Sequence, residues 1–198
     1  MIEIAIRVLA GSADQDRAHH FSRDGTDILI IADGAGGASG GTEAAELVVR
    51  HDFSRCLSPE ACTARITALD TEVSVARAAG ETTAVVAIVQ NGIVYGASVG
   101  DSGAWLLGGG GIVDLTRDQR RKPLLGSGEA IPVAFGPIAL AGRLLLASDG
   151  LLKYVAREVV WRLGQGGDLE RAADALVAAA RLPGGGLQDD VSLALVRA

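Results

Sequence analysis

The chain has 198 residues, of which 48% are hydrophobic and 21% charged, a balance typical of a globular domain rather than a disordered chain. Its formal net charge of −6 argues against a nucleic-acid partner, because phosphate backbones favour clustered lysine and arginine. The longest weakly charged stretch, Ile138–Leu152, is interrupted by Arg143 and Asp149, so we expect no membrane span. We therefore expect a single cytoplasmic domain spanning residues 1–198.

The first 80 residues predict two strands followed by two helices. Residues 2–10 and 28–32 are short apolar runs of the kind found in strands, and the first lacks the basic start of a signal peptide. A glycine-rich segment, residues 34–41, indicates a tight turn or a loop that lies against a ligand. We expect one helix from about Thr42, which we take as its capping residue, and a second from Ser58-Pro59 to about Ala78.

The remainder of the chain predicts strands, then helices and a closing strand. Residues 83–89 and 93–98 flank Asn91-Gly92, the strongest short signal for a β-hairpin. Further strands are expected on both sides of four consecutive glycines and at residues 144–147 and 191–196. Helices are expected within residues 151–163 and over 168–181, where Asp168 is the capping residue. This order predicts a layered α+β domain.

Cys56 and Cys62 are the two cysteines of the chain. Two cysteines supply neither a disulfide framework nor the ligand spacing of a zinc site. We expect both to be buried thiols in a reducing compartment.

Aspartates lie next to several of the predicted strands. Asp33, Asp101 and Asp149 follow apolar runs, Asp189 precedes the last strand, and Asp16 comes soon after the first. A single aspartate in such a place is usually a turn or capping residue. Several that converge would repel one another unless cations neutralise them, and carboxylates suit Mg²⁺ or Mn²⁺.

Five segments in order resemble the motifs of the type 2C metal-dependent serine/threonine phosphatases. They are Asp14-Gln15-Asp16, Ala32-Asp33-Gly34 with the glycines after it, Thr82-Thr83-Ala84-Val85 with Val99-Gly100-Asp101-Ser102, Leu145-Leu146-Ala147-Ser148-Asp149-Gly150, and Asp189-Asp190-Val191-Ser192. The resemblance runs from about Gly11 to the end of the chain. It implies a four-layer α-β-β-α sandwich in which helices flank two antiparallel sheets.

The resemblance also implies a role for each matching residue. Asp33 would bridge two Mn²⁺ or Mg²⁺ ions, and the Gly34 carbonyl would ligate one of them. Asp149 and Asp189 would bind one ion, with Asp16 holding its water shell, and Asp101 would belong to a looser third site. Asp33 and Asp149 would thereby position a metal-bridging water that attacks phosphoserine or phosphothreonine of a protein substrate. The compact form resembles bacterial signalling members, which implies a partner kinase system.

Two departures from the family pattern concern substrate binding. Gly11 stands where many members carry an arginine that binds the substrate phosphate, and Arg7 and Arg17 are candidates to replace it. The region corresponding to the family's mobile flap, about 117–141, is short, so we expect an open site with low sequence selectivity. The substrate-binding residues are not identified by the sequence.

Two alternatives to a protein phosphatase remain open. A relative that has lost turnover would bind a partner or a phosphorylated ligand, and the loss of the arginine favours it. The retained aspartates oppose it. A hydrolase of small phosphoesters would share the same ion site and differ only in the groove.

Overall fold

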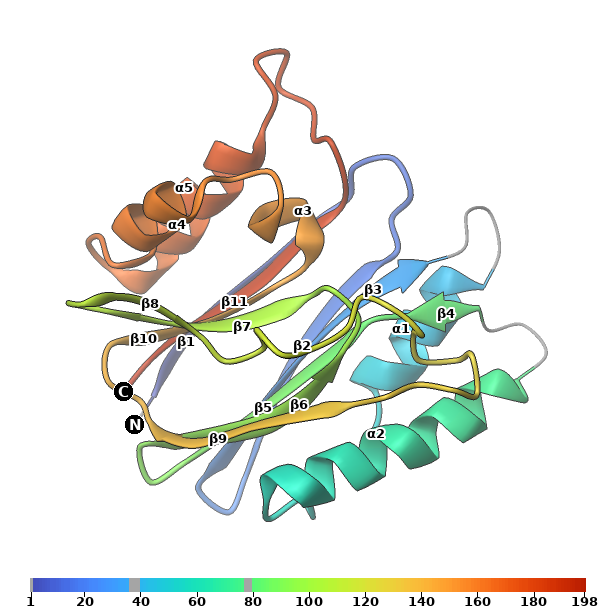
Figure 1. Ribbon diagram of the computed structural model, residues 1–198. Helices are drawn as coiled ribbons and strands as arrows, with labels where there is room; N and C mark the ends of the chain where they lie inside the picture. Colours follow the sequence, from blue (N-terminus) through green and yellow to red (C-terminus); the bar gives the residue numbers. More distant parts are fainter. Residues whose placement is uncertain (1, 36–39, 77–79) are drawn as a thin grey trace.

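Two antiparallel β-sheets packed face to face form the centre of the computed structural model, which describes residues 2–35, 40–76 and 80–198 (Figure 1). The first sheet has the order β1-β11-β10-β7-β8 and the second β2-β3-β5-β6-β9, with β4 paired to β3. The strands are β1 (Glu3–Leu9), β2 (Asp16–Arg23), β3 (Thr26–Ala35), β4 (Glu81–Thr82), β5 (Ala84–Gln90), β6 (Ile93–Val99), β7 (Gly103–Gly108), β8 (Gly111–Asp114), β9 (Val133–Ala139), β10 (Arg143–Ala147) and β11 (Val191–Arg197).

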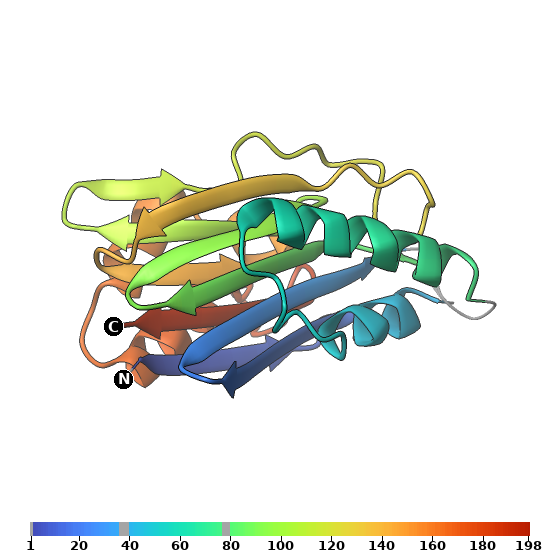
Figure 2. The same cartoon turned by 90° about the horizontal axis from the view of Figure 1, so that it is seen from below.

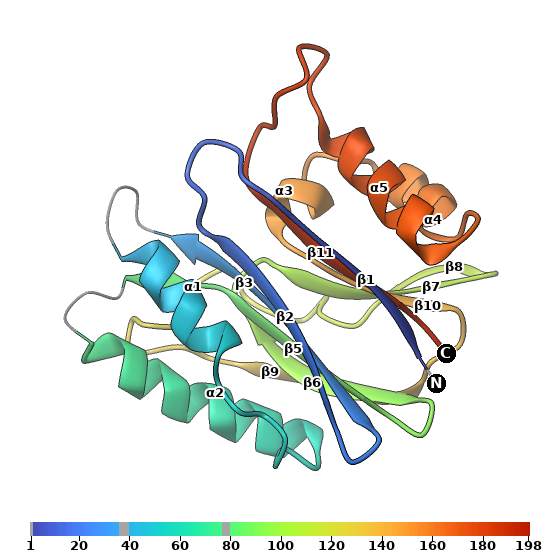
Figure 3. The same cartoon turned by 180° about the vertical axis from the view of Figure 1, so that it is seen from behind.

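Helices cover the outer face of each sheet. Helices α1 (Gly41–Val49) and α2 (Pro59–Ser74) pack on the second sheet, and α2 lies along its face in Figure 2. Helices α3 (Asp149–Leu152), α4 (Arg157–Gly164) and α5 (Leu169–Ala180) lie on the side of the first sheet (Figure 3). The four-layer α-β-β-α sandwich with two antiparallel sheets is therefore confirmed.

Strand β3 shows how the core separates into layers. Its side chains alternate between faces, as the two-residue period of a strand requires. Ile28, Ile30 and Ala32 pack among the residues beneath α1 and α2. Leu29 and Ile31 face the first sheet and share a core cluster with residues of that sheet such as Leu144. This double burial accounts for the continuous apolar run in the sequence.

The predicted hairpin joins β5 to β6 through Asn91 and Gly92, whose φ angles are 51° and 74°. Positive φ at both central residues is the geometry that an Asn-Gly turn favours. The predicted caps of α2 and α5 are also confirmed. Ser58 accepts a hydrogen bond from the Ala61 amide at 3.2 Å, and Asp168 accepts one from Arg171 at 2.9 Å.

The predicted start of α1 was wrong in its capping residue. The helix begins at Gly41, and its N-cap is Gly40 with φ of 92° and no capping side chain, whereas Thr42 lies inside the first turn. Helix α2 ends at Ser74, so it stops short of the predicted end at Ala78, which lies outside the described residues. Both cysteines are free and buried, as predicted.

Three strands, the two-residue β4 and the longer β2 and β9, are additional to the strands predicted from the sequence. Strand β2 begins at Asp16, and β9 occupies the later part of the region assigned to the shortened flap. Strands β2 and β9 each form an edge of the second sheet. What remains between β8 and β9 is the connecting segment 115–132.

This connecting segment is fixed to the rest of the domain. Leu125 and Thr82 exchange backbone hydrogen bonds of 2.9 and 3.0 Å. The buried Asp70 carboxylate of α2 accepts backbone amide hydrogen bonds at 2.6, 3.1 and 3.0 Å from Gly126, Gly128 and Ala130. The segment is thus held by side chains and backbone from two other elements.

Across the described residues, no helix has the length and hydrophobicity that crossing a bilayer requires.

Replacing Asp70 tests this attachment. We expect Asp70→Ala to lower the free energy of unfolding by about 2–3 kcal/mol, because three backbone amides lose the buried carboxylate that they share as acceptor. Urea denaturation followed by circular dichroism measures the change. Glu72→Ala removes an exposed carboxylate from the same helix and should change stability by less than about 0.5 kcal/mol. Equal effects of the two substitutions would contradict the role given to Asp70.

Candidate functional site

Asp16 and Asp33 face each other directly across the β2–β3 ladder. Like charges opposite one another in a sheet are destabilising, so this pairing has a cost that the fold alone does not require. Asp33 is held by its backbone: its amide donates to the Thr83 hydroxyl at 3.0 Å, and its carbonyl accepts from the Thr83 amide at 2.8 Å. The two carboxylates are therefore placed by rigid strands rather than by a loop.

The Asp16 carboxylate is almost completely buried, with 1% of the residue exposed. Neither of its oxygens has a well-formed hydrogen bond in the structure. Burial raises the pKa of Asp16 to about 6, while the nearby Ser148 and Ser192 hydroxyls oppose this rise. A buried carboxylate that lacks firm partners indicates a group missing from its surroundings.

Asp33 carries the largest electrostatic penalty of the site. Burial first, and then the charges of Asp16 and Asp149, raise the pKa of Asp33 to about 9. Asp189 acts in the same direction. The four carboxylates predicted to bind two cations therefore lie near enough to one another to repel, as their positions at strand ends suggested.

Asp149 and Asp189 lie next to the ends of two neighbouring strands, β10 and β11. Asp149 begins α3 directly after β10, and Asp189 precedes β11. The Ser192 amide donates to the Ser148 hydroxyl, and the Ser148 amide to the Ser192 carbonyl, both at 3.0 Å. Burial, followed by the charges of Asp101 and Asp189, raises the pKa of Asp149.

Gly150 allows the start of α3 to pack closely against the residues that precede β11. A Cβ atom at Gly150 would lie 1.9 Å from the Asp190 carbonyl oxygen, far inside van der Waals contact. The Asp149-Gly150 pair is thus required for the packing of α3 against the start of β11, in addition to any turn that it makes.

Asp190 has a role that the sequence reasoning missed. Its carboxylate accepts amide hydrogen bonds from Gly11 and Gln15 at 2.6 Å each, and a longer one of 3.4 Å from Ala13. Burial alone would raise the pKa of Asp190, but the donated amides hold it below its usual value. Asp190 therefore fixes the β1–β2 loop beside the site. The Asp189-Asp190 doublet was the only sequence signal for it.

Gly11 leaves no room for the arginine found there in many type 2C phosphatases. A Cβ atom at Gly11 would lie 2.7 Å from the Asp189 carbonyl carbon. The two candidate replacements are engaged elsewhere. Arg7 pairs with Glu170 and Asp174 of α5, each at 2.7 Å. Arg17 donates to the carbonyls of Asp14 and Asp16 and lies 3.4 Å from Glu46.

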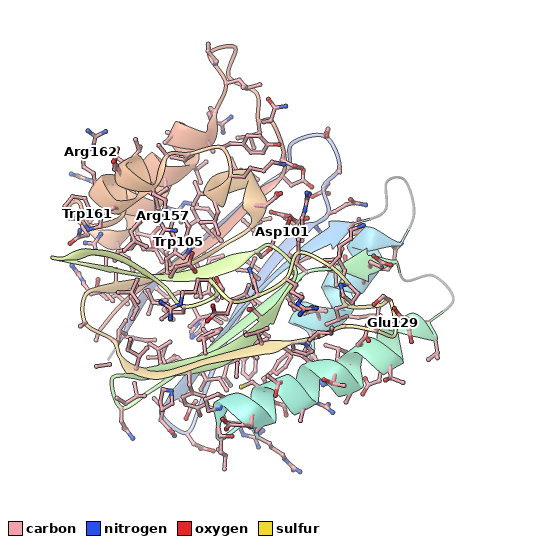
Figure 4. The ribbon with its side chains drawn as sticks, in the orientation of Figure 1. Asp101, Trp105, Glu129, Arg157, Trp161 and Arg162 are labelled. Carbon is pink, nitrogen blue, oxygen red and sulfur yellow. The ribbon has the colours of Figure 1, made fainter. Side chains whose placement is uncertain are left out.

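Asp101 lies beside the cluster but already has a cationic partner. The Arg121 Nε donates to Asp101 Oδ2 at 2.7 Å. Figure 4 shows Asp101 close to α3, on the side of the sandwich away from the chain termini. Asp101 thus differs from Asp16, whose oxygens lack such a partner.

The residues present fit a pair of divalent cations by their chemistry. The donors are carboxylates, with the Gly34 carbonyl on the same strand as Asp33, and such oxygens suit Mg²⁺ or Mn²⁺. As placed within residues 2–35, 40–76 and 80–198, no three His, Cys, Asp or Glu side chains already form a complete cation cage. The case for cations rests instead on the buried Asp16 oxygens and the mutual repulsion around Asp33. Residues 36–39 of the predicted glycine-rich loop lie outside the described residues.

The fold is similar to those of solved bacterial serine/threonine phosphatases. The S. agalactiae serine/threonine phosphatase superposes with a TM-score of 0.82 at 20% identity, covering 99% of each chain. The catalytic domain of the phosphatase PstP, solved with two manganese ions, gives 0.79 at 25% identity, covering 98% of this chain and 97% of that one. Stp1 from Staphylococcus aureus gives 0.80 at 21% identity, covering 100% and 95%. The predicted relationship to bacterial phosphatases of type 2C is thus confirmed at the level of the fold.

A scan against models of known protein families and a search of curated proteins gave no match.

Asp33→Asn tests whether the carboxylates repel one another in the metal-free protein. We expect the substitution to raise the free energy of unfolding at pH 7 in EDTA by about 1–3 kcal/mol, because an amide avoids the cost of taking up a proton that the raised pKa of Asp33 imposes on folding. Mn²⁺ should raise the unfolding temperature of the unchanged protein but not of the variant.

Asp24→Asn is the matched control, since Asp24 is 94% exposed at a turn with φ of 51°, where asparagine is well tolerated. It should leave both measurements unchanged. An Asp33→Asn variant that is less stable than the unchanged protein in EDTA would contradict the repulsion.

Proposed function

We propose that this protein is a metal-dependent phosphatase that hydrolyses phosphoserine and phosphothreonine on protein substrates. The single observation that carries the proposal is that Asp33 pairs with Asp16 across the β2–β3 ladder and that the charges of Asp16, Asp149 and Asp189, from both sheets, all act on it. The similarity to bacterial serine/threonine phosphatases over almost the entire chain supports it.

The proposed cation ligands are Asp33, Asp149, Asp189, the Gly34 carbonyl and, through its water shell, Asp16. When bound, two Mn²⁺ or Mg²⁺ ions would supply an activated water and neutralise phosphoryl oxygens. Asp33 and Asp149 would position that water for attack in line with the departing serine or threonine oxygen. Rigid strand ends suit this task, because preorganised groups need not rearrange as charge develops.

The phosphorylated protein and the kinase that produces it are the partners that this proposal implies. The hollow beside Asp101 has a volume of about 300 Å³ and opens to the surface. An open site of this kind is compatible with a side chain presented by a folded protein or a peptide.

The first experiment measures phosphate release from a phosphothreonine peptide in Mn²⁺, in Mg²⁺ and in EDTA. We expect release with either cation and none in EDTA. Asp149→Asn should lower kcat at least about 100-fold, because it removes a charged group from the centre of the site. Asp24→Asn, remote from the site, should keep full activity. Thermal unfolding of each variant shows whether it is folded.

Two results would redirect the assignment. If a folded protein that binds Mn²⁺ released no phosphate under any condition, the enzymatic proposal would fail and the partner-binding alternative would replace it. If p-nitrophenyl phosphate were turned over with a higher kcat/KM than phosphopeptides, a small phosphoester would be the better substrate class.

A further inference from the structure

Basic residues gather in one short segment beside the acidic cluster. Residues 117–122 contain Arg117, Arg120, Arg121 and Lys122 but one acidic residue, in a chain whose net charge is −6. This segment belongs to the connection between β8 and β9. Residues 117–122 therefore bring positive charge to the side of the site where Asp101 lies.

Arg121 is the member of this segment with a defined geometry. Its Nε contacts Asp101 at 2.7 Å, while the side chain remains 73% exposed. Its Nη1 and Nη2 atoms have no hydrogen-bond partner among the described residues. The planar end of the guanidinium is therefore free to bind an anion through two parallel hydrogen bonds.

Arg121 also lies close to the predicted catalytic groups. The charges of Arg121 and Asp101 both act on the Asp149 carboxylate, in opposite directions. Asp101 and Arg121 share a surface hollow of about 300 Å³ with Trp105 and Leu152. Figure 4 shows Asp101 and Trp105 on the same side of the sandwich.

The backbone around Arg121 is braced, which lowers the entropic cost of binding. Gln119 Nε2 donates to the Ser102 carbonyl at 2.7 Å, next to Asp101. Beyond Arg121, the Leu125–Thr82 hydrogen bonds hold the chain to the second sheet. A cation presented on such a segment is partly preorganised for its ligand.

The other cations near the site are less suited to bind a phosphoryl group. Arg157 lies over the Trp105 ring at 4.4 Å and pairs with Asp114 at 3.2 Å. Arg17 is held by two carbonyls of its own segment. Lys153 is 3.8 Å from Asp149 and offers a point charge rather than a planar pair of donors.

Building on the proposed phosphatase function, we propose that Arg121 binds the phosphoryl group of the substrate and that Asp101 positions its guanidinium. Arg121 thereby takes the part of the arginine that Gly11 cannot accommodate. A phosphorylated serine or threonine carries a charge of about −1.5 to −2 at neutral pH, which suits an exposed guanidinium beside a cation-binding cluster. The exposed ion pair with Asp101 is weak enough to adjust when the anion arrives.

Steady-state kinetics with a phosphothreonine peptide test this role. Arg121→Ala should raise KM about 10- to 100-fold and leave kcat within about threefold, because a charge-assisted contact to the bound phosphoryl group is lost. Arg121→Lys should recover part of the affinity. Arg120→Ala is the matched control, since Arg120 is exposed in the same segment and has no ion pair within the part of the chain that the structure describes.

Calorimetric titration of inorganic phosphate into the Mn²⁺-loaded protein gives a readout independent of turnover. Arg121→Ala should weaken phosphate binding about 10-fold or more, whereas Arg120→Ala should not. If the unchanged protein binds phosphate in this way but releases none from peptides, the proposed function fails while the role of Arg121 stands. Normal turnover with unchanged KM and phosphate affinity in Arg121→Ala would overturn the role of Arg121 alone.

Asp101→Asn separates positioning of Arg121 from cation binding. We expect this variant to raise KM about threefold, to add nothing in combination with Arg121→Ala, and to leave the number of bound Mn²⁺ ions unchanged. Loss of one Mn²⁺ ion per chain in Asp101→Asn would overturn the positioning role and assign Asp101 to a third cation.

Discussion

The electrostatic cost of bringing carboxylates near the partly buried Asp33 is the constraint on which the rest of the structure depends. Asp16 and Asp33 are opposite each other on neighbouring strands, and Asp149 and Asp189 approach them from the other sheet. Such an arrangement persists in a marginally stable domain only if the surrounding fold is rigid. The two packed sheets provide that rigidity, and the Ser148–Ser192 hydrogen bonds hold the two contributing strand ends together.

Much of the fold could be predicted because the interior strands have recognisable sequence patterns. Strand β3 is buried on both faces and β5–β6 is joined by an Asn-Gly turn, so both leave clear patterns in the sequence. Strands β2 and β9 do not, since each is a sheet edge with many exposed side chains. An edge strand needs little apolar alternation, and β9 even contains Pro137, which edges tolerate.

The residues of the candidate site could be proposed from the sequence, whereas the contacts that hold them in place could not. Aspartates at strand ends can be recognised one by one, and the strand order brings them together. The use of Asp190 to bind three backbone amides depends on where the β1–β2 loop passes, over 170 positions away in the chain. The same holds for Arg121 and Asp101, whose contact depends on the path of the β8–β9 connection. Such contacts follow from tertiary geometry rather than from local pattern.

The interior position of β11 in the first sheet has a consequence for the order of events during synthesis. This strand, formed by residues 191–197, lies between β1 and β10 and carries Asp189 and Asp190 at its start. Pairing between β1 and β11 closes almost the whole chain into one loop, a topology of high contact order. A nascent chain on the ribosome that lacks these residues has neither the last predicted cation ligand nor the anchor of the β1–β2 loop. The full set of predicted cation ligands can therefore come together only after residues 191–197 have been made and β11 has paired with β1 and β10.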